Sequence, residues 1–274
     1  MADPSAQSAS ENAPSGRLMP TAPRINTLRV GDIGAILVAG LRDFAKAPLY
    51  GLTFGAIYAV GGLLIVYFLT AFDVPFLAYP AASGFALIAP FVAAGVYEVS
   101  RRLEQDAPLS WSAILSVVWG QNRRDLGWMA VITFFSYYIW VDLAGIIYLL
   151  FFGLRELDFG IFVHALFNTP RGYMFLLLGN AAGAVMALIV FSVTVVSFPL
   201  LLDRNIDFVT AMVTSVKAVQ ANPVPMLAWC AIIAIVLFAS IATAFIALVV
   251  SLPILGHASW HLYRRTVSFD VKVT

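Results

Sequence analysis

The sequence predicts an all-α membrane protein: six transmembrane helices in one bundle, built from three repeats of one interfacial amphipathic helix followed by two membrane crossings. Three observations predict it. The chain is 61% hydrophobic and 11% charged, with a mean hydropathy of +0.89, whereas soluble domains are about 45–50% apolar and about 25% charged. Long uncharged stretches alternate with short basic segments. Similar segments also recur at intervals along the chain, as in repeat proteins.

The first 28 residues differ from the rest of the chain. They are rich in Ser, Ala and Pro and have no apolar periodicity, which is typical of disordered segments. They also lack the basic start and apolar core of a signal peptide. We therefore expect a disordered cytoplasmic tail over 1–28 and a single polytopic membrane domain over 29–268.

Uncharged stretches of membrane length give the number of crossings. The longest runs from Ala218 to Tyr263, 46 residues without Lys, Arg, Asp or Glu. As a helix it would be about 69 Å long, so it must fold back and cross a hydrocarbon core of about 30 Å twice. The predicted crossings are 48–72, 77–99, 126–152, 173–200, 224–246 and 247–265.

The basic residues predict the orientation. With these crossings, fourteen of the sixteen Lys and Arg fall on one side of the membrane, and only Arg155 and Arg171 fall on the other. Basic loops stay in the cytoplasm. We therefore expect both termini in the cytoplasm.

An internal repeat supports the six crossings. Segments with helical apolar periodicity precede the odd-numbered crossings, at 33–44, 111–118 and 208–219. The stretch "PFVAAGVYEVSRR" at 90–102 also matches "PILGHASWHLYRR" at 253–265, at an offset of 163 residues. The predicted repeats are 29–102, 108–204 and 205–265. Chance resemblance among apolar helices is the alternative.

The "GLRDFAKAP" entry to the first crossing and the closing "PILGHASWHLYRR" carry a resemblance. Over about residues 30–268, the chain resembles a bacterial integral-membrane family known only as a domain of unknown function. The resemblance implies a polytopic protein of a bacterial inner membrane and no established activity. Some relatives are labelled as like an oxidase subunit, but haem–copper chemistry needs many histidines and this chain has three.

Asp142 is the first candidate functional residue. It is the only charged residue between Asp125 and Arg155, and a carboxylate inside a bilayer helix is costly and often marks an ion or proton path. The alternative is a neutral or hydrogen-bonded Asp142 that joins helices through neighbouring aromatic residues. Helix-breaking prolines could free backbone groups to line a cavity; these are Pro80, Pro90, Pro199 and Pro253.

His257 and His261 form the second candidate site. Their i, i+4 spacing places both imidazoles on one helix face, where they could chelate a metal if further ligands were present. The repeat aligns Glu98 with His261, and Asp203 is another acid at a helix end. We favour a polar cluster of the histidines and Glu98 with basic helix-end anchors over a metal site. The anchors are Arg101, Arg102, Arg264 and Arg265.

The sequence carries no enzyme signature: it has no phosphate-binding glycine loop, no nucleophile elbow, no zinc-protease motif and no cysteine cluster. A net charge of +1 gives no electrostatic reason to expect nucleic-acid binding. We expect a non-enzymatic protein without cofactor or metal, whose partners are the bilayer and other membrane proteins. The first functional hypothesis is an accessory, scaffold or assembly partner of a membrane complex, such as a respiratory one. The alternative is a small transporter or channel that uses Asp142 and the helix prolines.

Overall fold

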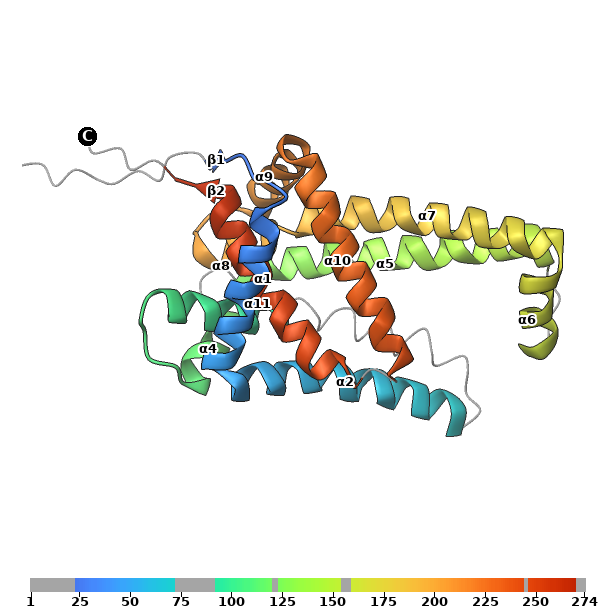
Figure 1. Ribbon diagram of the computed structural model, residues 1–274, viewed down its shortest axis with the longest axis horizontal. Helices are drawn as coiled ribbons and strands as arrows, with labels where there is room; N and C mark the ends of the chain where they lie inside the picture. Colours follow the sequence, from blue (N-terminus) through green and yellow to red (C-terminus); the bar gives the residue numbers. More distant parts are fainter. Residues whose placement is uncertain (1–22, 72–91, 120–122, 154–158, 244–245, 270–274) are drawn as a thin grey trace, which may run out of the picture.

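The computed structural model describes residues 23–71, 92–119, 123–153, 159–243 and 246–269. Helices make up most of these residues, so the chain is an all-α membrane protein (Figure 1). In chain order the elements are β1 (Arg24–Ile25), α1 (Asp32–Lys46), α2 (Pro48–Ala71), a helix over 92–104, α4 (Trp111–Trp119), α5 (Arg123–Phe152), α6 (Phe159–Asn168), α7 (Pro170–Thr194), α8 (Ser197–Asp203), α9 (Phe208–Ala221), α10 (Pro223–Ala242), α11 (Leu248–Thr266) and β2 (Val267–Ser268).

Proline marks the start of three long helices. Pro48, Pro170 and Pro223 are the first residues of α2, α7 and α10. Proline suits this position because its fixed φ fits the helix and the first backbone N–H has no partner within the helix. At α7, the Thr169 side chain also accepts a hydrogen bond from the backbone N–H of Gly172, at 3.0 Å. These prolines explain why amphipathic and apolar segments that adjoin in the sequence form separate helices.

Three helical stretches in the described part of the chain are long and apolar enough to cross a membrane: Arg124–Phe152, Pro170–Asp203 and Pro223–Ser240. A fourth is added if α1 and the first part of α2 count as one span, although they are bent by 103°. These stretches coincide with the third, fourth and fifth predicted crossings, and α2 coincides with the first.

The six-helix bundle is not confirmed. The second predicted crossing, 77–99, lies mainly outside the described residues, which resume at 92. The sixth corresponds to α11, which is helical but is not among the membrane-length apolar stretches and ends in Arg264 and Arg265. A shorter helix does precede each of α2, α5 and α10, namely α1, α4 and α9, but the amphipathic character of these helices as a repeated unit and the three-repeat architecture remain predictions.

Helices α5 and α7 form a long arm that extends away from the rest of the protein and carries α6 at its far end (Figure 1). Most side chains on the outer sides of the arm are not covered by other parts of the protein. Only 11% of the apolar part of α5 is buried, and large apolar side chains such as Leu150 and Leu177 are 75% and 67% exposed. Rings of α5, α6 and α7 pack together at the far end and stiffen it: Tyr148, Phe152, Phe162 and Phe175.

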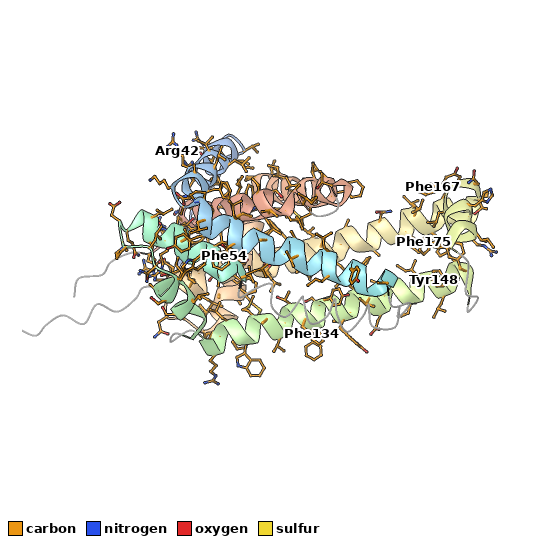
Figure 2. All side chains as sticks on the ribbon, turned by 90° about the horizontal axis from the view of Figure 1, so that it is seen from below. Arg42, Phe54, Phe134, Tyr148, Phe167 and Phe175 are labelled. Atoms are coloured by element: carbon orange, nitrogen blue, oxygen red, sulfur yellow. The ribbon has the colours of Figure 1, made fainter. Side chains whose placement is uncertain are left out.

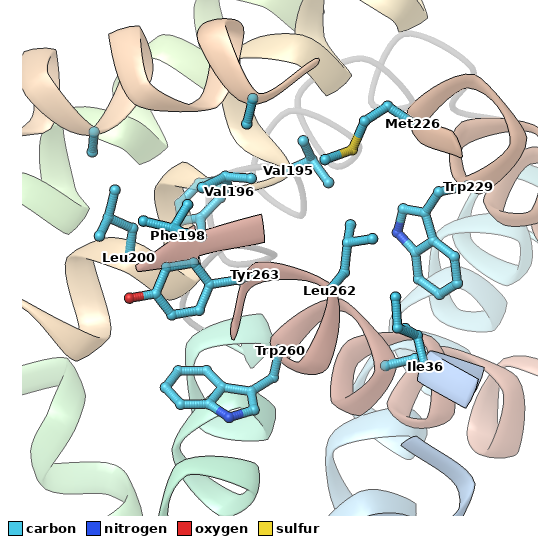
Figure 3. Close-up of a cluster of buried hydrophobic side chains, with 14 of the residues drawn as sticks. Ile36, Val195, Val196, Phe198, Leu200, Met226, Trp229, Trp260, Leu262 and Tyr263 are labelled. Carbon is cyan, nitrogen blue, oxygen red and sulfur yellow. The ribbon is translucent and has the colours of Figure 1, made fainter. Parts of the chain in front are cut away.

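The main core lies at the other end, where α1, α8, α9, α10 and α11 meet. Trp229, Trp260 and Tyr263 are fully buried there against aliphatic side chains of α1 and α8 (Figure 3). A short antiparallel pairing of β1 with β2 joins the two ends of the described chain beside this core. Leu28 is also buried there. The structure thus differs from the predicted disordered tail for residues 24–28.

Candidate functional site

The candidate site lies where α1, the 92–104 helix and α11 meet. Gly40 of α1 packs directly on Ala258 of α11: a Cβ atom added to Gly40 would lie 2.7 Å from Cβ of Ala258. This close approach depends on the missing side chain. It places Asp43, one turn further along α1, beside the histidine face of α11.

Four polar side chains are linked there by hydrogen bonds. Nε2 of His261 lies 2.8 Å from Oδ2 of Asp43. Oγ of Ser100 lies 2.8 Å from the same carboxylate oxygen and 2.7 Å from Nδ1 of His257. Ser100 and His257 are fully buried and Asp43 nearly so, whereas the side chain of His261 is 24% exposed. The chain of bonds therefore runs from a partly exposed imidazole to a fully enclosed one.

The hydrogen atoms that these four side chains carry determine which atom donates in each hydrogen bond. An ionised Asp43 can only accept, so Ser100 Oγ–H and His261 Nε2–H must both donate to it. Ser100 has then used its single proton, and it can bind His257 only by accepting from Nδ1–H. A neutral His257 in this tautomer has a lone pair on Nε2. That atom is buried and has no hydrogen-bond partner among the described residues.

A second group of charges surrounds Glu98, which is fully buried. Arg101 donates to its two oxygens from Nε and Nη2, at 2.6 and 2.8 Å, and Arg102 donates from Nε, at 2.7 Å. Arg102 also donates to the carbonyl oxygen of Pro108, at 3.1 Å. A buried carboxylate is stable only when paired in this way.

The last turn of α11 is tied to its surroundings through further acids. Glu104 accepts from Arg264 and from the indole N–H of Trp260, each at 2.9 Å. The Tyr263 hydroxyl donates to Asp203, at 2.7 Å. Arg265 donates to Asp32, at 3.1 Å. The predicted basic anchors thus bind acids of the protein itself, so their charge is largely neutralised locally.

The structure brings together most of the residues singled out from the sequence but pairs them differently. His261 binds Asp43, and Glu98 binds Arg101 and Arg102, in place of the pairing between Glu98 and His261 that the repeat suggested. Asp142 lies apart from this cluster, exposed on α5.

Sequence reasoning missed Asp43 and Ser100. Asp43 had a signal: together with Ile36 and Gly40 it follows the i, i+4, i+7 spacing of the buried face of α1. An acid on an apolar face needs a buried partner. Ser100 had no such signal.

The described part of the chain contains no group of three or more His, Cys, Asp or Glu side chains that could hold a metal ion. Three cavities, of about 740, 360 and 210 Å³, lie between α5 and α7. Their walls include Arg171, Trp140 and Asn180 but not Asp142, Pro199 or Pro253. None of these cavities therefore joins the carboxylate to the helix prolines; Pro80 and Pro90 lie outside the described residues.

Residues 78–203 match the DUF2189 family, described as a predicted integral membrane protein. The expected resemblance to an uncharacterised membrane-protein family is thus confirmed, although the closing motif at 253–265 lies outside the DUF2189 match. No curated protein and no solved structure matched the chain. The DUF2189 match covers the 92–104 helix of the polar cluster and the whole α5–α7 arm, and leaves out α1, α10 and α11.

Proposed function

We propose that this integral membrane protein is a non-enzymatic accessory or assembly partner of a membrane complex in the inner membrane of a bacterium. The proposal rests on the α5–α6–α7 arm. Each of its long helices is long enough to cross a bilayer; they pack on each other, on α6 at the far end and on α8 and α9 at the near end. Only 11% of the apolar part of α5 is buried, so much of the described lateral surface of the arm is available to other transmembrane helices.

Asp142 is the observation that favours a protein on this surface over lipid alone. It is exposed on α5, between the exposed side chains of Ile139 and Ile146, and has no hydrogen-bond or ion-pair partner among the described residues. A carboxylate at this depth is costly when it faces hydrocarbon. A polar group from a neighbouring membrane protein would remove that cost.

Purification of the tagged full-length protein from its native membrane in mild detergent tests the proposal. We expect a stable set of co-purifying membrane proteins for the wild type. Asp142→Asn should weaken this set, because it removes the charge and keeps the shape. Asp106→Asn, at an exposed acid outside the arm, is the matched control and should retain the partners. A monodisperse homo-oligomer without a partner would contradict the accessory role.

A second function, a small proton-coupled transporter, is favoured by a different observation. The chain from His261 through Asp43 and Ser100 ends at an enclosed imidazole nitrogen with a free lone pair. Such chains of carboxylate and imidazole occur in proton relays of membrane proteins. A proton flux into vesicles that is present for the wild type and absent for Asp43→Asn would favour this function over the accessory role.

A further inference from the structure

The outward face of α1 combines apolar and basic side chains. Val38 and Leu41 are 49% and 52% exposed, although α1 buries Ile36 and Gly40 on its other side. Arg42 and Lys46 are exposed directly beside Val38 and Leu41 on the same face, and Arg42 lies on the outer side of α1 in Figure 2. We refer to Val38, Leu41, Arg42 and Lys46 as the outward face of α1.

The direction of α1 relative to its neighbours places this face at a membrane surface. The axis of α1 makes an angle of 103° with the first part of α2. Figure 1 shows α1 running across the direction shared by α2, α5 and α7, at the end opposite α6. If the long helices cross the bilayer, α1 lies along its surface, where an apolar strip contacts acyl chains and flanking cations contact headgroups.

The charges of α1 determine which lipid fits. Its two acids point elsewhere: Asp43 is buried against His261, and Asp32 accepts from Arg265. The described part of the chain places no acid in an ion pair with Arg42 or Lys46. The outward face therefore carries two uncompensated positive charges, which complement an anionic headgroup and offer nothing specific to a zwitterionic one.

The site described above also fixes this face in position. The contact of Gly40 with Ala258 and the bond of Asp43 to His261 hold α1 on α11, so α1 cannot roll about its own axis. We propose that the outward face of α1 binds anionic phospholipid headgroups, with Val38 and Leu41 in the interfacial layer and Arg42 and Lys46 on the phosphates.

Native mass spectrometry of the full-length protein, titrated with phosphatidylglycerol or phosphatidylcholine, tests this. We expect the wild type to bind phosphatidylglycerol more tightly than phosphatidylcholine. Arg42→Gln and Lys46→Gln should each weaken phosphatidylglycerol binding by about fivefold, as expected for one basic residue at an anionic surface. Neither substitution should change phosphatidylcholine binding. Both side chains are exposed, so the variants should fold, and a thermal melt checks this.

Arg171→Gln is the matched control, because Arg171 is an exposed arginine at the opposite end of the protein. It should leave the affinity for phosphatidylglycerol unchanged. Equal binding of the two lipids by the wild type, or an equal loss in the Arg171 variant, would overturn the proposal. So would the loss of a co-purifying protein in the Arg42 or Lys46 variant with lipid preference intact, because that result assigns the face to a protein partner.

Discussion

Asp43 and His261 are separated by 218 residues in the sequence, yet Nε2 of His261 lies 2.8 Å from Oδ2 of Asp43. The bond closes the first amphipathic helix onto the last helix of the chain. Asp43 accepts from Ser100 as well, so one carboxylate connects three segments that are distant in the sequence. The stability of this end of the protein should therefore depend strongly on Asp43.

Asp43→Ala should destabilise the detergent-solubilised protein by about 3 kcal/mol, because it leaves the donors of Ser100 and His261 without their acceptor in a buried site. Chemical unfolding followed by tryptophan fluorescence measures the change. Lys217→Ala, at an exposed position of α9, is the control and should change stability little. Equal effects of the two substitutions would mean that the carboxylate does not hold the three helices together.

Gly40→Ala and Gly34→Ala should have opposite effects, although both glycines lie in α1. An added Cβ at Gly40 meets Ala258 at 2.6 to 2.8 Å, whereas at Gly34 it meets nothing within 4 Å. Gly40→Ala should cost about 2 kcal/mol through overpacking. Gly34→Ala should stabilise the helix by up to about 1 kcal/mol, because alanine has the higher helix propensity. Thermal melts of the two variants and the wild type compare them directly, and a neutral Gly40→Ala would show that α1 does not pack as described.

Glu98→Gln should destabilise far more than Glu104→Gln. Glu98 is fully buried and pairs with Arg101 and Arg102, so its removal leaves two cations without their partner, at a cost of about 3 kcal/mol or more. The side chain of Glu104 is 36% exposed, and surface ion pairs contribute about 1 kcal/mol or less. Unfolding midpoints of both variants test the ranking, and the reverse order would refute it.

The predicted orientation can be tested with fusions. A reporter that is active only in the cytoplasm should give a signal when placed after Thr274, because fourteen of the sixteen basic residues fall on the predicted cytoplasmic side. The same reporter inserted within residues 154–171, the segment between α5 and α7 that contains α6, should give none. A signal only from that segment would reverse the orientation.

The sequence predicts the features of this fold that depend on local composition, and it does not predict those that depend on distant contacts. Composition and the long uncharged stretches predict an all-α membrane protein, and three membrane-length helical stretches do coincide with the third, fourth and fifth predicted crossings. The separation of the α5–α7 arm from the core could not be predicted. Apolar residues that face lipid and apolar residues that face protein have the same hydropathy, so periodicity does not distinguish them.

For the candidate site, the sequence predicts that polar residues gather at this helix end, but it does not predict which side chains they bind. Histidines next to arginines at a helix end indicate a polar cluster, and the structure places His257 and His261 in one. The partner of His261 depends on where α1 crosses α11, and that crossing depends on the contact between Gly40 and Ala258. No local pattern in the sequence encodes such a distant contact.

The bond between the first and last helices has a consequence for synthesis of the chain. Asp43 leaves the ribosome 218 residues before His261. At about 5–20 residues per second, this interval is about 10–40 s. During that time the carboxylate cannot have the imidazole partner that it has in the finished protein, so α1 cannot reach its final position until α11 has been made. In a chain that ends before α11, Asp43 retains Ser100 as a donor but never gains the imidazole of His261.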